Sequence, residues 1–346
     1  MPFTELGPGP KPLVRPTMAD VARLAGVSLK TVSRVVNGED NVSQSTARTV
    51  QGVIQELGYR RNDHARALRQ ETGPRMLGLV TKDVSNPFYS AITRGVEEEV
   101  RERSLLVVTG SSDEDAARER ELLEVLCERR VGGLLVVPTG SDHSFLASEL
   151  ALGTPVAFID RPPCNLSADT ILIDNVGGAQ AAVAHLVAHG HRRVAMVGDL
   201  PELFTTSERV RGYHMALREG GIAHDESLVR VGCHDIAEAE AATRQLLALP
   251  HPPTALFTGN NRITYGALRA LSGVSPRPAL VGFDDFELAS LVSPPVSVIS
   301  YDSVELGRQA ARLICERLDG VTGPPRQIVV STELVPRGSG EVPPPY

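Results

Sequence analysis

Residues 17–37, TMADVARLAGVSLKTVSRVVN, constrain the fold more than any other stretch of this chain. Apolar residues recur at helical spacing on both sides of Gly26, whose permissive backbone allows a tight turn. Thr17 and Ser28 stand where the two helices would begin, and Asp20 follows Thr17 at the spacing of a capping box. The apolar positions are Met18, Val21, Ala22 and Ala25 before the glycine, and Val32, Val35 and Val36 after it. The pattern predicts two short helices joined by a glycine turn.

The second predicted helix carries a polar and basic face without acidic residues. This face consists of Leu29, Lys30, Thr31, Ser33, Arg34 and Asn37. A short helix of this kind, held by a preceding helix, fits the major groove of DNA. An ordinary helical hairpin with a solvated face is the alternative, because short motifs produce many false matches. A third helix follows, with Ser43 as its cap, Gly58 at its end and Tyr59 closing a small core.

Charge is distributed unevenly along the chain. Residues 17–70 contain eight Lys or Arg against five Asp or Glu, a net charge of +3, and residues 1–16 add +1. Because the whole chain carries −7, residues 71–346 carry −11. A basic segment suits binding to a polyanion, whereas an acidic one does not. The asymmetry favours a DNA-binding head on an acidic body.

The segments AGVSLKTVSRVVN and NVSQSTARTVQGVIQELGYRRNDHARALR resemble the LacI/GalR family of bacterial transcription regulators. The resemblance extends over about residues 17–338 and implies that the second helix enters the major groove. The residues implied to face base edges are Leu29, Lys30 and Arg34. Those implied to lie near phosphates are Thr17, Ser28, Thr31, Ser33, Asn37, Asn41, Ser43 and Thr46. Chemically, arginine and lysine can donate to guanine O6 and N7, while hydroxyls and amides can bind the DNA backbone.

A second informative segment, residues 60–73, reads RRNDHARALRQETG. The family resemblance implies a hinge helix here that folds on operator DNA and packs against the same helix of a second copy. Leu68 would then insert into the minor groove, with Arg66 and Arg69 beside it. A helix of two turns is not stable alone in water, so a flexible linker with solvated charge is the alternative.

From residue 75 to 340, short apolar runs alternate with amphipathic helical stretches. This alternation predicts parallel sheets covered by helices on both faces. Roughly 265 residues exceed what one sheet core holds, so two lobes are expected. The predicted fold class is therefore α/β, with an N-terminal three-helix helix-turn-helix domain and a hinge helix before a two-lobed body. The resemblance implies that this body is periplasmic-binding-protein-like.

Domain boundaries follow from these patterns. The predicted segments are a disordered tail over 1–16, the helix-turn-helix domain over 17–61, the hinge helix and linker over 62–74, the effector-binding and dimerisation domain over 75–340, and a disordered tail over 341–346. Within the body, the resemblance implies a first lobe of about 75–172 and 302–326 and a second lobe of about 173–301 and 327–340.

Polar residues end most of the apolar runs, where the strands of a parallel sheet place ligand sites. A single Asp or Asn after a strand is more often a helix cap, but together these residues suit a sugar-like effector. The positions that the resemblance assigns to the effector are Phe88, Tyr89, Asp160, Arg209, Asn260 and Asp284, with Arg209 and Asp284 ranked highest. Lys82 could meet an anionic effector, and an exposed lysine at a strand end is the alternative. The chain departs from the family at His234, where relatives have an aromatic residue, and at Asn261 and Arg262.

Composition excludes several classes of protein. The four cysteines are far apart, and the pair His185 and His189 lacks a companion ligand, so neither a metal nor another cofactor is expected. No apolar run approaches the about 18 residues of a membrane span, and the N-terminal residues lack the apolar core of a signal peptide. No motif of a nucleophile elbow, P-loop or dinucleotide turn is present, so an enzyme is not expected. We expect a bacterial cytoplasmic protein that joins the nucleoid through DNA, without a membrane partner.

The leading hypothesis is a ligand-responsive, sequence-specific transcription regulator, with a repressor favoured. It would bind a pseudo-palindromic operator as a homodimer, with a small effector, a sugar or sugar derivative, in the cleft between the lobes. The alternatives are a solute-binding protein without DNA activity and a regulator that senses a nucleoside or a phosphorylated or acidic effector. The sequence leaves open the effector, the sign of its effect, the operator, the regulated genes, and dimer versus tetramer.

Overall fold

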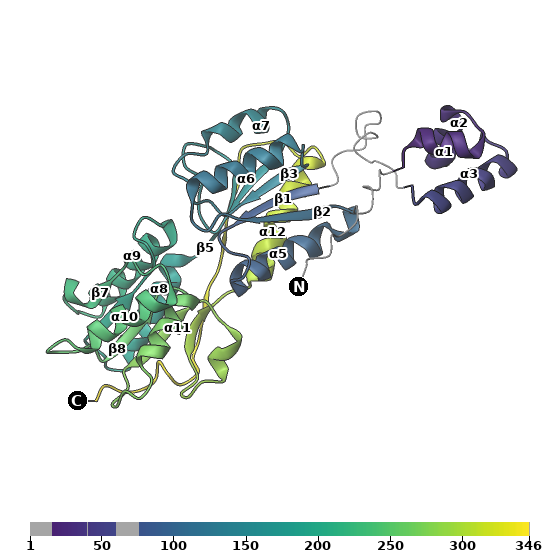
Figure 1. Cartoon of the computed structure of the whole chain (residues 1–346). Helices are drawn as coiled ribbons and strands as arrows, with labels where there is room; N and C mark the ends of the chain where they lie inside the picture. The colour runs from purple at the N-terminus through teal and green to yellow at the C-terminus, as the bar shows by residue number, and fades with distance from the viewer. Residues whose placement is uncertain (1–15, 40, 60–75, 346) are drawn as a thin grey trace, which may run out of the picture. The chain divides into compact units, whose positions relative to one another are not determined.

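The computed structural model describes residues 16–39, 41–59 and 76–345. They belong to two compact units, residues 1–73 and residues 74–346, and each unit is described by itself. Figure 1 shows both units with labels on many of their helices and strands. Over these described ranges, no helix combines the length and the apolarity needed to cross a membrane.

The first unit contains three helices, α1 (Met18–Ala25), α2 (Leu29–Asn37) and α3 (Gln44–Leu57). Each begins at a side chain that accepts a backbone N–H from three residues further on, and each ends at a glycine in the left-handed conformation. The capping residues are Thr17, Ser28 and Ser43, and the glycines are Gly26, Gly38 and Gly58. Val21, Val32 and Val50 are fully buried between the helices. The predicted three-helix domain is confirmed.

The second unit holds two six-stranded sheets with strand orders β11-β5-β4-β3-β1-β2 and β12-β10-β9-β8-β6-β7. The strands of the first sheet are β1 (Met76–Thr81), β2 (Leu106–Ser111), β3 (Gly133–Val136), β4 (Val156–Ile159), β5 (Asp169–Ile173) and β11 (Gln327–Val330). Those of the second are β6 (Val194–Val197), β7 (Val229–Arg230), β8 (Ala255–Thr258), β9 (Ala279–Phe283), β10 (Ser297–Ser300) and β12 (Glu333–Val335). All pairings are parallel except that of β12 with β10. The predicted pair of parallel-sheet lobes is thereby confirmed.

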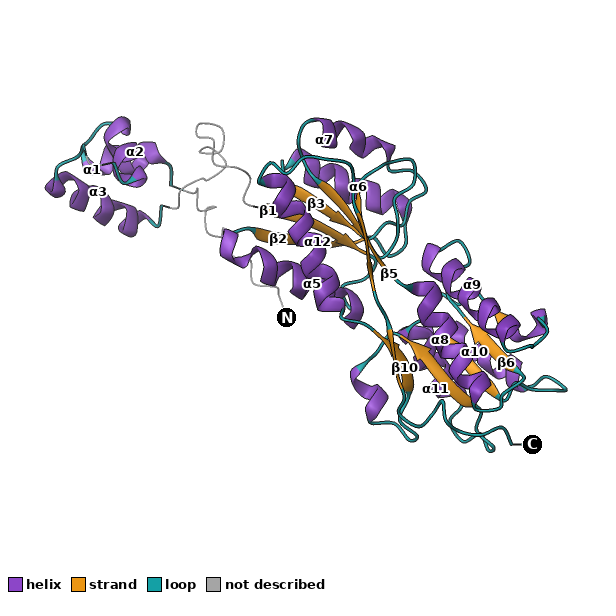
Figure 2. Cartoon of the chain, turned by 180° about the vertical axis from the view of Figure 1, so that it is seen from behind, coloured by secondary structure: helices purple, strands orange, loops and turns teal. Residues whose placement is uncertain are grey.

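Helices cover both faces of each sheet, as Figure 2 shows. Those of lobe 1 are α5 (Pro87–Val100), α6 (Ala116–Glu128), α7 (Ala147–Ala151) and α12 (Ser303–Leu318). Those of lobe 2 are α8 (Asn175–Ala188), α9 (Phe204–Glu219), α10 (Ile236–Leu247) and α11 (Asn261–Ala270). Helices α5 and α12 approach so closely that a Cβ atom on Gly95 would lie 1.9 Å from the Val304 carbonyl oxygen. Glycine at this position therefore lets the two helices pack backbone to backbone.

The chain passes from lobe to lobe near residues 174, 301–302 and 331–332, between elements of different sheets. The sequence placed 327–340 in lobe 2, and this assignment is wrong for residues 327–330. Strand β11 pairs with β5 of lobe 1, with Gln327 opposite Thr170. Its half-exposed pattern is that of an edge strand, and such a pattern does not say which of two sheets the strand joins.

The C-terminal segment also differs from its prediction as a disordered tail over 341–346. The Glu341 carboxylate has three partners in lobe 2 and its own loop: the His185 ring, the Ser297 hydroxyl and the Gly338 N–H. The carbonyl oxygen of Val342 lies 2.8 Å from Nε2 of His191. Because His185, His191 and Ser297 are distant in sequence, the proline-rich composition of the segment did not indicate these contacts.

Candidate functional site

The first candidate site is the exposed side of α2. Leu29 and Lys30 are exposed in the first turn of α2, and Arg34 is partly exposed in its last turn. Arg34 Nε lies 3.8 Å from the Glu39 carboxylate, just beyond the end of the helix. The structure therefore places all three predicted base-reading residues on one short helix that is accessible from outside the domain.

The predicted phosphate contacts gather largely at helix N-termini. The Ser28 hydroxyl accepts the Thr31 N–H at 3.1 Å, and the Ser43 hydroxyl accepts the Thr46 N–H at 3.2 Å. Thr17 caps α1 in the same manner. The remaining three residues of the set, Ser33, Asn37 and Asn41, lie within or just after α2. Helix N-termini favour anions through their free N–H groups and the helix dipole. The predicted hinge residues Arg66, Leu68 and Arg69 lie outside the described residues.

The second candidate site is a cavity between the two sheets, at the carboxyl ends of their strands. All six residues that the sequence assigned to the effector line it, namely Phe88, Tyr89, Asp160, Arg209, Asn260 and Asp284. The other lining residues are Lys82, Asn86, Arg161, Asp199, Thr205, Asn261, Arg262 and Tyr301. The cavity volume is about 40 Å³. Since ligand pockets measure about 300–1,000 Å³, the walls must move apart to admit a molecule of that size.

Asp160 and Asp284 occupy corresponding places in the two lobes. Asp160 directly follows β4, and Asp284 directly follows β9. Their φ angles are 70° and 69°, in the left-handed region that residues with a side chain rarely adopt. Both side chains are buried. Backbone strain of this kind concentrates at functional sites, because the surrounding structure must hold it in place.

Arg209, near the start of α9, is fixed by four groups. Its Nε donates to Asn175 Oδ1 at 2.8 Å, and its Nη1 donates to the carbonyl oxygen of Gly259. Its Nη2 lies 3.9 Å from Asp284 Oδ1, and the guanidinium carbon stands 3.8 Å from the centre of the Phe283 ring. The guanidinium is therefore buried, oriented and paired at the wall of the cavity.

Tyr301 is a site residue that the sequence did not predict. Its hydroxyl donates to Asp284 Oδ1 at 2.7 Å, and its ring meets the Phe88 ring edge to face with centroids 6.1 Å apart. Burial and the Asp284 charge raise the pKa of Tyr301 well above its ordinary value, so the hydroxyl stays protonated and can donate. The residue lies on the crossing between β10 and α12, directly after the apolar run SVIS, and this position is the signal that could have identified it.

Lys82 is neither an exposed lysine nor an unpaired cation. Its side chain is 13% exposed, and its Nζ lies 3.1 Å from Glu114 Oε1 and 3.5 Å from Asp199 Oδ2. Glu114 also accepts two hydrogen bonds from Arg161, at 2.7 and 2.9 Å. Burial alone would raise the pKa of Glu114, but Arg161 and Lys82 outweigh it and hold the pKa at about 2. The sequence did not predict Glu114 or Asp199 as partners, because neither stands near Lys82 along the chain.

Three polar contacts cross from lobe 1 to lobe 2 around the cavity. The Lys82–Asp199 pair is the first. Arg262 Nη1 lies 3.4 Å from Asp83 Oδ2, and Asn261 Nδ2 donates to Asn86 Oδ1 at 2.9 Å. Two of the three therefore use Asn261 and Arg262, two positions at which we expected the sequence to depart from the family that it resembles. The third such position, His234, does not line the cavity, and its ring nitrogen lies 3.8 Å from Asp199.

Two buried acceptors at the cavity have no hydrogen-bond partner within the described part of the chain, Asp160 Oδ1 and Asn261 Oδ1. Burial raises the pKa of Asp160 to about 6, although Arg161 and Arg209 lower it in part. An unpaired buried acceptor is costly, so a ligand that offers O–H or N–H donors here would remove that cost.

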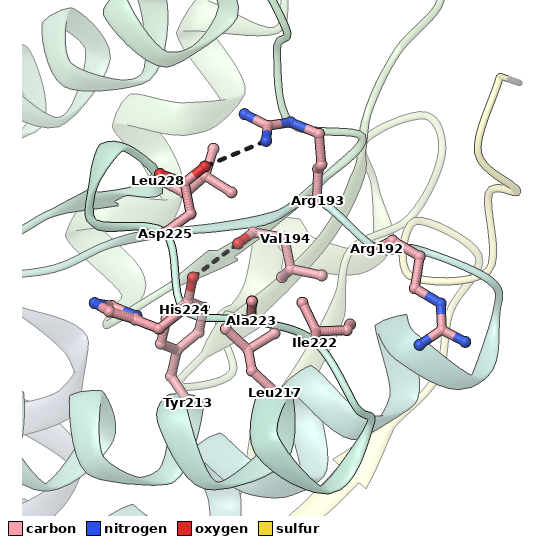
Figure 3. A pocket seen from close by; sticks show the side chains of 10 residues that line it. All are labelled: Arg192, Arg193, Val194, Tyr213, Leu217, Ile222, Ala223, His224, Asp225 and Leu228. Carbon is pink, nitrogen blue, oxygen red and sulfur yellow. Dashed lines mark hydrogen bonds and ion pairs between the residues drawn. The ribbon is translucent and has the colours of Figure 1, made fainter.

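A larger cavity of about 440 Å³ lies in lobe 2, beside the first residue of β6 (Figure 3). Its polar side chains already have partners. The Tyr213 hydroxyl donates to the Val194 carbonyl oxygen at 2.8 Å, Arg193 pairs with Asp225 at 3.2 Å, and Arg192 donates to the Gly220 carbonyl oxygen. The inter-lobe cavity is smaller but has unpaired acceptors, so it is the better candidate for a polar ligand. No group of three or more potential metal ligands occurs among the residues that the structure describes.

Comparison with known proteins assigns a family to each of the two units. Residues 17–62 match a family model described as bacterial regulatory proteins, lacI family, and residues 183–340 match a periplasmic binding protein-like domain. The HTH-type transcriptional regulator CelR of Thermobifida fusca is 33% identical over 94% of this chain and 98% of its own length. The ribose operon repressor of Escherichia coli K12 is 32% identical over 93% and 99%.

Solved structures agree with these matches. The complex of the transcriptional regulator CelR with cellobiose has a TM-score of 0.69 at 32% identity, over 94% of this chain and 100% of the other. The lac repressor dimer bound to operator and the anti-inducer ONPF has a TM-score of 0.80 at 26% identity, over 95% of this chain and 100% of the other.

Proposed function

The chain belongs to the LacI family of bacterial regulatory proteins, and from this membership we propose how its two sites act as a ligand-responsive, DNA-binding transcription regulator. The cavity between the lobes binds a small effector, and the exposed side of α2 binds operator DNA. The observation that carries the proposal is the set of buried Asp160, Arg209 and Asp284 around one cavity, together with an accessible basic helix in the first unit. Repression is the favoured direction of control.

We assign base reading to Leu29, Lys30 and Arg34, and phosphate contacts to the residues at the N-termini of α1, α2 and α3. A dimer would place two α2 helices in successive major grooves of a pseudo-palindrome. Leu68, flanked by Arg66 and Arg69, is proposed as the minor-groove wedge on the basis of the sequence alone.

Arg34→Ala should weaken binding to the preferred duplex by about 1–3 kcal/mol, because a guanidinium paired with guanine O6 and N7 discriminates by about that much. Binding to random duplex should fall far less. Fluorescence anisotropy at physiological salt on both duplexes measures the two losses. Arg23→Ala, which removes the same charge from α1, is the control. An equal loss on both duplexes for Arg34→Ala would contradict base reading.

We propose a neutral polyhydroxy compound as the effector. Every cationic side chain that lines the cavity has a carboxylate partner within 4 Å: Lys82 with Glu114, Arg161 with Glu114, Arg209 with Asp284 and Arg262 with Asp83. An added phosphate would therefore find no unpaired cation. The free acceptors of Asp160 and Asn261 call for hydroxyl donors, and the Phe88 and Tyr301 rings offer an apolar face. The CelR relative was solved with cellobiose, which has this chemistry.

The test combines DNA selection with a ligand screen on the full chain. The duplex is enriched from a random pool, and neutral sugars, sugar phosphates and nucleosides are then screened for a rise in melting temperature. A ligand at a hundred times its dissociation constant stabilises the folded state by about 2.7 kcal/mol. We expect a neutral sugar to shift the melting temperature and to change affinity for the enriched duplex. A response to phosphorylated compounds alone would overturn the neutral assignment.

Two exposed leucines of the second unit support our proposal that the chain associates with a second copy. Leu106, on the edge strand β2, is 67% exposed, and Leu291 of lobe 2 is 76% exposed. The lac repressor relative is a dimer. Leu106→Asp should raise the dimer dissociation constant at least about tenfold, because a carboxylate replaces apolar contact area. Analytical ultracentrifugation checks this, with Leu152→Asp as the control, because Leu152 is also strongly exposed, at 79%. An unchanged constant for Leu106→Asp, or the same change in both variants, would place the interface elsewhere.

A further inference from the structure

We propose that Glu39 is a positioning residue for base reading, and this inference rests on the proposed role of Arg34. Its carboxylate holds the Arg34 guanidinium at the Nε edge and leaves the two Nη groups free to meet a guanine. Glu39 thereby raises the ratio of specific to non-specific DNA affinity.

The end of α2 brings the two side chains together. Gly38 ends the helix with φ of 69°, and the following N–H of Glu39 donates to the Arg34 carbonyl oxygen at 3.0 Å. This turn directs the chain back along the last turn of α2. Oε2 of Glu39 then lies 3.8 Å from Arg34 Nε, and Oε1 accepts from Asn37 Nδ2 at 3.3 Å. A side chain at position 38 would strain this left-handed turn.

In this pair, the Arg34 guanidinium contacts Glu39 through Nε, while its two Nη groups point elsewhere and can meet a guanine. A guanidinium presents its Nε edge and its Nη pair in different directions, and guanine O6 and N7 are best met by a two-pronged donor. A carboxylate at the Nε edge restricts the rotamers of Arg34 before DNA arrives. Less side-chain freedom is then lost on binding, which favours the correct base contact.

The same carboxylate acts on non-specific binding in the opposite sense. Non-specific affinity comes from cations near phosphates, so an anion just beyond the end of the DNA-facing helix weakens it. Residues 21–38 contain no Asp or Glu, and Glu39 is therefore the first acid after Asp20. Both effects of Glu39 increase discrimination between sequences.

Stability is a poor explanation for the pair. Both side chains are partly exposed, and exposed ion pairs contribute little to folding. Glu39→Gln should therefore leave the melting temperature unchanged, while it alters base selectivity. This difference distinguishes a positioning role from a structural one.

The experiment uses the full chain and the duplex that it enriches from a random pool. Affinities are measured for that duplex, for single-base changes at each guanine, and for a random duplex. Measurements on Arg34→Ala first identify the guanine at which a base change no longer alters the affinity of this variant. At that guanine, Glu39→Gln should lower the affinity ratio between original and changed duplex about two- to fivefold, the range of an exposed charge pair. In an Arg34→Lys background, Glu39→Gln should not change this ratio further, because lysine lacks the forked guanidinium.

Glu56→Gln is the matched control, since it removes the same charge from an exposed position of α3. Glu56→Gln should raise affinity for the random duplex but leave unchanged the affinity ratio between the original duplex and the duplex with the changed guanine. The inference is overturned if Glu39→Gln leaves the ratio unchanged or if Glu56→Gln lowers it equally. It is also overturned if Arg34→Ala alters preference at no base. Failure of the wild-type chain to enrich any sequence would instead contradict the proposed function itself.

Discussion

Arg209→Met is expected to lower the free energy of unfolding of the second unit by about 3–5 kcal/mol, the cost of breaking a buried charge pair. The substitution leaves the Asp284 carboxylate without its cation and the Asn175 oxygen without its donor. It also removes the cation that stands on the Phe283 ring. Because the same guanidinium lines the cavity, stabilisation by the effector should disappear as well.

Urea unfolding followed by circular dichroism measures this loss. Arg211→Met is the control, because Arg211 lies on the same helix but is exposed and pairs with Glu208 at the surface. Its effect should stay within about 0.5 kcal/mol. A loss below about 1 kcal/mol for Arg209→Met would contradict the buried network.

Asp160→Asn is expected to stabilise the protein at pH 8 by about 3 kcal/mol. Burial raises the pKa of Asp160 to about 6, so the ionised carboxylate destabilises the folded state above that pH. Below the ordinary aspartate pKa near 4, Asp160 is protonated and contributes no penalty to the free energy of unfolding. As the pH rises through about 6, the buried carboxylate ionises and this stability is lost. An asparagine resembles the protonated acid and lacks the penalty, so its advantage should shrink towards zero as the pH falls from about 6 to 4.

The measurement is the difference in unfolding free energy between variant and wild type at several pH values. A gain that does not depend on pH would contradict the buried, ionisable carboxylate. Asp284→Asn, at the corresponding place in lobe 2, serves as the control with the opposite sign. Asp284 accepts hydrogen bonds from Tyr301 and from the Asn261 N–H and pairs with Arg209, so its neutralisation should destabilise the fold.

Local signals made the first unit predictable. Thr17, Ser28 and Ser43 each cap a helix through an N–H only three residues away, and a glycine ends each helix. The six effector positions came together because each lies in the loop or helix after a strand of a parallel sheet, and the carboxyl ends of these strands share an edge. The family resemblance then selected them from the other polar strand ends.

Long-range pairing was not predictable in the same way. Glu114 and Asp199 come from different lobes, and only the folded cleft brings both to Lys82. The sheet that β11 joins and the partners of Glu341 depend on the same distant geometry. Hydrophobic pattern and turn chemistry describe a segment and its neighbours, so they carry no information about such contacts.

The two sheets of the second unit share one strand order, although β11 is parallel to its neighbour and β12 is antiparallel. If β1 to β5 are matched in order with β6 to β10, and β11 with β12, the two strand orders become identical. Asp160 and Asp284 are then the same position of the repeat, which also explains their shared backbone conformation. In our proposal, an effector bound between them would meet one carboxylate from each lobe. The two single variants and the double variant therefore form a thermodynamic cycle that measures how strongly these two carboxylates cooperate.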